Sequence, residues 1–173
     1  FPLFFQDLGC FWPGILPGHP LYPVKMLRDK IFDWFIKDPL KKAEYHLLMA
    51  DKRLNAGLFL INKGKPELGE STISKGEKYL ENGLSELQKA KAAGKDITPV
   101  LGKFSLATLK HQEVLGELLE KVPEAAKTGI QNALEKSQKG IQRVQELQGI
   151  KLEEKLKGGA TPPPPPPPVR RTQ

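Results

Sequence analysis

The chain is poor in the residues that build disulfide frameworks and metal sites. Its 173 residues include one cysteine, Cys10, and three histidines that lie far apart in the sequence. A single thiol excludes an internal disulfide scaffold and a Cys-rich zinc site. The Glu-x-x-His pairs of di-iron bundles and the signatures of nucleotide-binding loops, zinc proteases and serine hydrolases are also missing. We therefore expect no metal, no cofactor and no catalytic residues, so the protein is not predicted to be an enzyme.

Aromatic residues are scarce and unevenly placed, and so are the prolines. Nine of the thirteen aromatic residues fall within residues 1–36, and twelve of the sixteen prolines lie either in the first 23 residues or in the run 162–168. The other four prolines, at positions 39, 66, 99 and 123, divide the middle of the chain into stretches of helical length. We expect helices over residues 21–36, 39–63, 66–94, 98–121 and 123–157, with Gly149 as an alternative end of the last helix. Asp38 and Thr98 are predicted N-caps, and Gly64 is a predicted terminator.

Small residues recur every seven positions in three of these helices, and a larger residue follows each of them four positions later. Because such positions share one helix face, they predict seams along which helices approach closely, as in coiled coils. Glycine inside a helix costs about 1 kcal/mol relative to alanine, so three glycines at one heptad position favour a packing role. The fold class predicted is all-α: an antiparallel bundle of about four long helices with a short, aromatic-rich N-terminal helix. The small residues are Ala43, Ala50, Gly57, Gly69, Gly76, Gly83, Ala126, Ala133 and Gly140, followed by Leu47, Leu54, Ile61, Ile73, Leu80, Leu87, Ile130, Ser137 and Val144.

The helix predicted over 98–121 carries two polar residues on its apolar stripe. Thr108 and His111 fall at the same three-and-four spacing as Leu101, Phe104, Leu115, Leu118 and Val122. We interpret both as buried polar residues and favour a register role for His111 over titration or ligand binding. An enzyme that pairs His111 with Glu113 is the weakest hypothesis, because residues two apart on a helix do not face each other. The Lys/Glu stretches between the seams, such as residues 75–78, are predicted to be solvated.

The two ends differ from the helical body, and we divide the chain into an irregular N-terminal segment (1–20), a bundle (21–157) and an extended Gly/Pro-rich tail (158–173). Residues 1–20 are too often interrupted for a transmembrane helix and show no signal-peptide pattern. Since the first residue is Phe1 rather than Met, we expect further residues upstream. The polyproline tail is interpreted as a stiff spacer, with docking into an aromatic groove as the alternative. Candidate interaction residues are Trp12, Trp34, Phe35, Pro162, Pro165 and Pro168.

The helix over residues 21–36 has an apolar stripe that allows two interpretations. It either clamps across the bundle as a lid or lies on a membrane interface. Membrane-surface helices usually carry a basic polar face, whereas residues 1–36 hold three cations and three aspartates. This balance favours the clamp. The stripe comprises Val24, Leu27, Ile31, Trp34 and Phe35.

A further indication of the fold and family comes from two short sequences, ILPGHPLYPVK at residues 15–25 and DPLKKAE at residues 38–44. Leu47, Ala50, Arg53 and Leu54 follow them at helical spacing. Over residues 15–125 the chain resembles the prokaryotic family known as domain of unknown function 5667. The resemblance implies an all-helical domain that often follows a secretion signal, hence a place outside the cytoplasmic membrane. It implies no established activity and no catalytic residues.

These observations predict a non-enzymatic helical interaction or structural module, extracytoplasmic or associated with the envelope. A protein or an envelope polymer is the expected partner, and membrane-surface contact through residues 1–36 is a further option. The alternative is a basic polyanion- or nucleic-acid-binding protein. We do not favour it, because the net charge of +7 is spread thinly and few aromatics accompany it.

Overall fold

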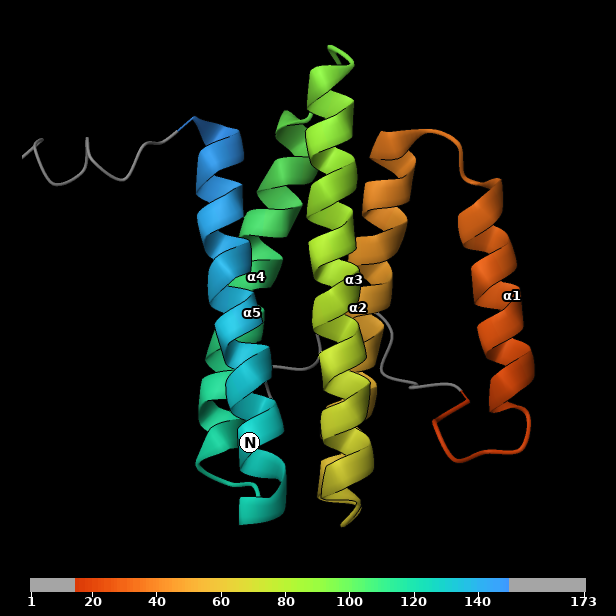
Figure 1. Ribbon diagram of the computed structural model, residues 1–173, viewed down its shortest axis with the longest axis vertical. Helices are drawn as coiled ribbons and strands as arrows, with labels where there is room; N and C mark the ends of the chain where they lie inside the picture. The colour runs from red at the N-terminus through yellow and green to blue at the C-terminus, as the bar shows by residue number, and fades with distance from the viewer. Residues whose placement is uncertain (1–14, 150–173) are drawn as a thin grey trace, which may run out of the picture.

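The computed structural model describes residues 15–149, which form five α-helices joined by short connections (Figure 1). Successive helices run in opposite directions, so the predicted all-α class with antiparallel packing is confirmed. The predicted tail and the segment before residue 15 lie outside the described residues. The helices are α1 (Tyr22–Phe35), α2 (Pro39–Asn62), α3 (Pro66–Ala92), α4 (Thr98–Leu119) and α5 (Glu124–Gln148).

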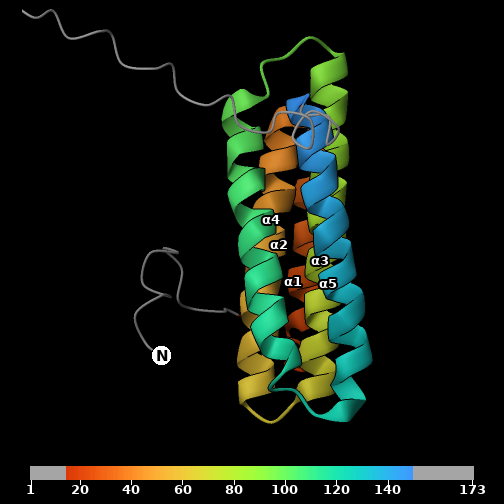
Figure 2. The same ribbon diagram turned by 90° about the vertical axis from the view of Figure 1, so that its left-hand side faces the viewer.

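Helices α2 to α5 form the bundle, and α1 stands outside it. Helix α3 packs against both α2 and α5, and α4 packs mainly against α5. The two views show α1 beside α2, on the side of the bundle away from α4 and α5 (Figures 1 and 2). Helix α1 therefore lies at the edge of the molecule and covers little of the core.

Most helix boundaries follow the predicted signals. Asp38 caps α2, because its Oδ1 accepts hydrogen bonds from the backbone N–H groups of Leu40 and Lys41 at 2.8 and 3.2 Å. Gly64 follows α2 with a φ of 74°, the left-handed conformation that glycine adopts most easily. The proposed terminator and the first cap are thus confirmed.

Two boundaries differ from the prediction. Thr98 is the first residue of α4 rather than its cap, and its N–H donates instead to Oδ1 of Asp96 at 2.9 Å. Helix α5 ends at Gln148, where Gly149 adopts a φ of 74°, so the alternative end is correct and the boundary at 157 is wrong. A left-handed residue cannot continue a right-handed helix, which explains the earlier stop.

The glycines of α2 and α3 allow their backbones to approach closely. A Cβ placed on Gly69 would lie 2.7 Å from the carbonyl oxygen of Gly57, and one placed on Gly76 would lie 3.2 Å from that of Ala50. Near the end of the same seam, a Cβ on Gly83 would lie 2.6 Å from the ring of Phe104. We call Gly57, Gly69, Gly76 and Gly83 the glycine seam; all four are buried. The predicted close packing is confirmed.

The core consists of two apolar clusters, one toward each end of the bundle. Leu47, Leu80, Phe104 and Val144 belong to the first cluster, and Leu54, Ile73, Leu115 and Ile130 belong to the second. Each cluster takes residues from all four bundle helices. Between the two clusters lies a layer of polar residues.

Within residues 15–149, no helix combines the length and the apolar character needed to cross a membrane.

Candidate functional site

The polar layer between the two apolar clusters contains at least one residue from each helix of the bundle. Its centre is His111 of α4, a residue that is 1% exposed. The Nδ1 atom of His111 lies 2.7 Å from Oε1 of Glu77 on α3, and its Nε2 atom lies 3.0 Å from Oδ1 of Asp51 on α2. One buried imidazole thus joins three helices through two carboxylates.

Two hydroxyl groups complete the polar layer. Thr108, one turn before His111, donates from its hydroxyl to the backbone carbonyl of Phe104 at 2.9 Å. Ser137 on α5 donates to the backbone carbonyl of Thr108 at 3.2 Å. Since buried polar groups require partners, the bond from Ser137 fixes α5 in register with α4, whereas the Thr108 hydroxyl is satisfied within α4. The structure therefore places Thr108 and His111 on the seam where their spacing put them. We define the polar layer as Asp51, Glu77, Thr108, His111 and Ser137.

The carboxylates determine the protonation of His111. Burial lowers the pKa of the imidazole, but the hydrogen bonds to Asp51 and Glu77, together with their charges, outweigh it and raise the pKa to about 9. His111 is therefore an imidazolium at neutral pH, and both of its ring N–H groups donate.

The burial of Glu77 shows that one prediction, solvation of the whole stretch 75–78, is wrong. Glu77 lies in the Lys/Glu stretch expected to be solvated, yet it is 2% exposed. A carboxylate is buried only when a partner compensates its charge, and His111 supplies that partner. The sequence did contain one indication that Glu77 is buried, which is its position directly after Gly76. A residue next to a buried seam position lies partly toward the neighbouring helix.

The polar layer is suited to holding helices together rather than to turning over a substrate. His111 and Glu77 are both shielded from solvent, and only Asp51 is partly exposed. The pairing of His111 with Glu113 is wrong, because Glu113 is exposed and the carboxylates near the ring come from α2 and α3. Over the part of the chain that the structure describes, no group of three His, Cys, Asp or Glu side chains could hold a metal ion.

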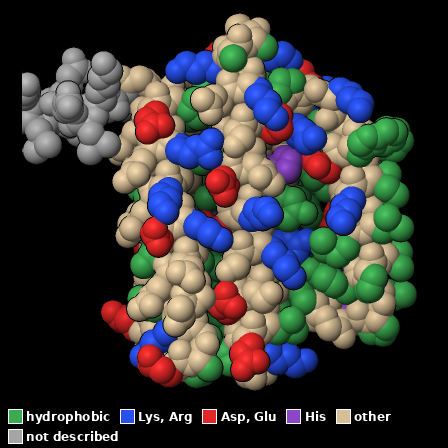
Figure 3. Space-filling view, in the orientation of Figure 1, with side chains coloured by type: hydrophobic (Ala, Val, Ile, Leu, Met, Phe, Trp, Pro, Cys, Tyr) green, Lys and Arg blue, Asp and Glu red, His purple; other side chains and the backbone are tan. Residues whose placement is uncertain are grey.

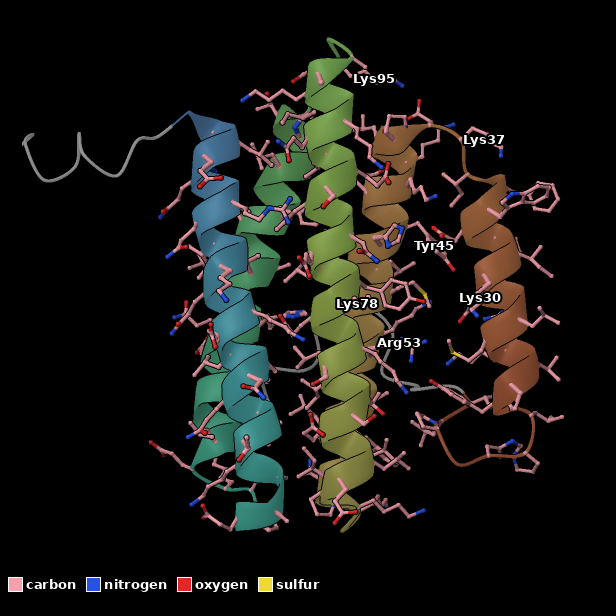
Figure 4. All side chains as sticks on the ribbon, in the orientation of Figure 1. Lys30, Lys37, Tyr45, Arg53, Lys78 and Lys95 are labelled. Carbon is pink, nitrogen blue, oxygen red and sulfur yellow. The ribbon has the colours of Figure 1, made fainter. Side chains whose placement is uncertain are left out.

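Helix α1 contacts α2 through its polar side. Arg53 of α2 donates from Nη1 to the hydroxyl of Tyr22 at 2.7 Å, and its Nη2 lies 2.9 Å from the sulfur of Met26. About two turns earlier on α2, the hydroxyl of Tyr45 donates to the backbone carbonyl of Asp29 at 3.0 Å. Figure 4 shows Arg53 and Tyr45 pointing from α2 toward α1. Burial and the neighbouring Asp29 raise the pKa of Tyr45 to about 12, so its hydroxyl remains a donor.

A third contact lies near the carboxyl end of α1. Oδ1 of Asp33 is 2.9 Å from Nε2 of His46 and 3.8 Å from Nζ of Lys42. Burial lowers the pKa of His46 and outweighs the opposing effect of Asp33, so the imidazole is neutral at neutral pH. Both aspartates of α1, Asp29 and Asp33, therefore face α2.

The apolar stripe of α1 faces solvent, so the clamp interpretation is wrong. Trp34 is 67% exposed and Phe35 is 63% exposed, and Ile31, in the middle of the stripe, is still 46% exposed. Hydrophobic side chains accordingly gather along the edge of the molecule formed by α1 (Figure 3). The polar contacts with α2 lie on the other side of α1 and would be lost if the helix turned its stripe inward. We call Val24, Leu27, Ile31, Trp34 and Phe35 the apolar face of α1.

Of the predicted interaction residues, Trp34 and Phe35 lie together on this face, with ring centroids 5.0 Å apart. Trp12, Pro162, Pro165 and Pro168 lie outside the described residues. Sequence reasoning missed Arg53, Tyr45 and His46, the residues that set the orientation of α1. Their signal was weak: each is a single polar or aromatic residue on a long helix.

Comparison with known proteins assigns most of the chain to a family. Residues 14–125 match a family model described as "Domain of unknown function (DUF5667)". The matched segment includes α1 to α4 and all of the polar layer except Ser137. No curated protein and no solved structure matches the chain.

Proposed function

The chain belongs to the family of the domain of unknown function DUF5667, and from that premise we propose that it is a non-enzymatic helical interaction module. It works outside the cytoplasmic membrane of a prokaryote, in keeping with the secretion signals that often precede such domains. The bundle is the rigid support, and the apolar face of α1 is the contact surface. Its partner is a protein or a component of the cell envelope.

The exposed apolar face of α1 is the observation that carries this proposal. Single exposed hydrophobic residues are ordinary, but five on one face of a short helix form a contiguous patch. Such patches on soluble domains mark surfaces that bind something. In the polar layer, His111 and Glu77 are shielded from solvent and paired with each other, which suits a structural role.

The polyanion-binding alternative receives less support from the placement of the lysines. Several surface lysines form ion pairs with glutamates, which lowers the local positive potential of the bundle. These pairs span 2.7 Å between Nζ and a carboxylate oxygen at Lys103–Glu44, Lys127–Glu124 and Lys139–Glu135. A nucleic-acid site gathers its cations, whereas here acidic partners are interspersed.

A salt titration of envelope binding tests the proposal. We expect the full chain to co-sediment with a prokaryotic envelope fraction and to retain the apolar part of its binding at high sodium chloride, because apolar contacts are not screened. The double variant Leu27→Ser, Ile31→Ser should bind at least about tenfold more weakly, since it removes two central side chains of the face.

A matched control uses exposed leucines of α4. Leu106 and Leu109 are 72% and 52% exposed, and Leu106→Ser with Leu109→Ser removes a similar apolar area far from α1. This variant should bind like the original chain. Binding that falls steeply with salt and ignores the α1 substitutions would overturn the proposal in favour of polyanion binding.

A further inference from the structure

We propose that α1 is an interfacial membrane helix whose apolar face inserts into a bilayer surface that carries anionic headgroups. This inference rests on the proposed function and names the partner of the same surface. The structure supports it through the charges around the face, the position of α1 and the kinds of side chain that the face contains.

The orientation of α1 places its aspartates toward α2 and leaves most of its cations exposed. Asp29 is 5% exposed, and Asp33, whose side chain is 34% exposed, faces His46 and Lys42 of α2. Three ionic groups of α1 and of the two residues that follow it, Ile36 and Lys37, are exposed. They are Arg28, Lys30 and Lys37. Arg28 pairs with Oδ1 of Asp29 at 2.7 Å, so the exposed surface of α1 gains its positive charge chiefly from Lys30 and Lys37, and the balance of charge along the sequence is shifted toward cations there. Anionic lipid complements this charge.

The cations flank the apolar face instead of interrupting it. At 100° per residue, Lys30 falls on one side of the stripe, whereas Arg28 and the half-buried Lys25 fall on the other. Lys37 lies at the carboxyl end of α1 with its ammonium 4.9 Å from the ring of Trp34 (Figure 4). Long cationic side chains beside an apolar strip can reach the headgroups while the strip enters the acyl boundary. We call Lys25, Arg28, Lys30 and Lys37 the cationic rim.

As far as residues 15–149 are concerned, the position of α1 lets a flat surface reach the apolar face without any rearrangement. Helix α1 lies at the edge of the molecule and its face points away from the bundle (Figures 1 and 3). An interfacial helix lies in the plane of the membrane with its apolar side buried about 5–10 Å deep. The polar contacts of Arg53 and Tyr45 on the other side of α1 remain intact in this pose.

Vesicle binding tests the proposal on the full chain. We expect the protein to co-sediment with vesicles of phosphatidylcholine mixed with phosphatidylglycerol, and to bind pure phosphatidylcholine vesicles much more weakly. The variant Trp12→Phe leaves Trp34 as the sole tryptophan. Its fluorescence should shift to shorter wavelength with the mixed vesicles, because the indole leaves water.

Two pairs of variants separate the contributions of charge and apolar surface. Each rim cation contributes a factor of about five at an anionic surface, so Lys30→Gln with Lys37→Gln should weaken binding to mixed vesicles about thirtyfold. Lys75→Gln with Lys136→Gln makes the same change of net charge at exposed positions of α3 and α5, and should have little effect. Leu27→Ser with Ile31→Ser should abolish the Trp34 shift, whereas Leu106→Ser with Leu109→Ser should preserve it.

The other outcomes separate this inference from the proposed function. Envelope binding that depends on Leu27 and Ile31 without any binding to vesicles would overturn the lipid inference and leave the interaction module standing, with a protein or polymer as its partner. A dimer in sedimentation experiments that the same two substitutions dissociate would also overturn it, because a second copy would then cover the face. If every α1 variant still binds the envelope fraction as well as the original chain does, both proposals are contradicted.

Discussion

Replacing Gly69 with alanine is expected to lower the free energy of unfolding by about 2–3 kcal/mol, although alanine is the better helix former. The new Cβ would lie 2.5 Å from Cγ1 of Ile61 and 2.7 Å from the carbonyl oxygen of Gly57. A side chain can turn aside, but a backbone carbonyl inside a helix cannot, so α2 and α3 must separate. Urea denaturation followed by circular dichroism measures the difference.

Gly116 of α4 provides the matched control. It also lies within a helix, but a Cβ there would meet nothing within 4 Å. Gly116→Ala should therefore stabilise the protein by up to about 1 kcal/mol, because only the helix propensity changes. Equal effects of the two substitutions would show that the glycine seam is not a close backbone contact.

The second large effect is expected at His111. His111→Leu removes the positive charge between Asp51 and Glu77 and leaves Glu77 buried without its partner. Breaking a buried pair in this way costs about 3–5 kcal/mol. Combining His111→Leu with Glu77→Leu should recover much of that loss, because the double variant leaves no buried carboxylate beside the leucine. A double variant no more stable than His111→Leu would contradict the role assigned to the pair.

The same histidine makes stability depend on pH in a predictable direction. The pKa of His111 is about 9 in the folded protein, against 6.5 for an unperturbed histidine. Its contribution is therefore fully present below pH 6.5 and is lost as the pH rises through 9, by an amount of about 3 kcal/mol. The difference in unfolding free energy between the original chain and His111→Leu should shrink over that range. His46 has a lowered pKa, so its effect on the pH dependence of stability has the opposite sign. Because His46 is present in both the original chain and His111→Leu, this effect cancels in the difference between them.

The bundle could be predicted from the sequence because its signals are periodic. Glycine recurs at one heptad position in α3, and only a close helix contact explains that pattern at positions such as Gly69 and Gly76. The burial of Thr108 and His111 follows from the same kind of spacing. Periodicity assigns residues to a face, and in a bundle the face determines burial.

The orientation of α1 could not be predicted in the same way. Its apolar stripe is equally consistent with an inward face, and the balance of its charges along the sequence argues against a membrane-surface role. Arg53 and Tyr45, which hold the polar side of α1, lie on a different helix, and no periodicity links them to Tyr22 or Asp29. The partner of Glu77 likewise comes from 34 residues further along the chain. Such contacts depend on three-dimensional placement rather than on local pattern.

The most direct test of the account is the chemical accessibility of the two sides of α1. In a Cys10→Ser background, the variants Leu27→Cys and Asp29→Cys each carry one thiol, two positions apart on nearly opposite sides of the helix. Maleimide should label the native Leu27→Cys protein rapidly and the native Asp29→Cys protein slowly, and both at the same rate in denaturant. Slow labelling of Leu27→Cys with rapid labelling of Asp29→Cys would show that α1 turns its apolar face to the bundle, which would contradict the account.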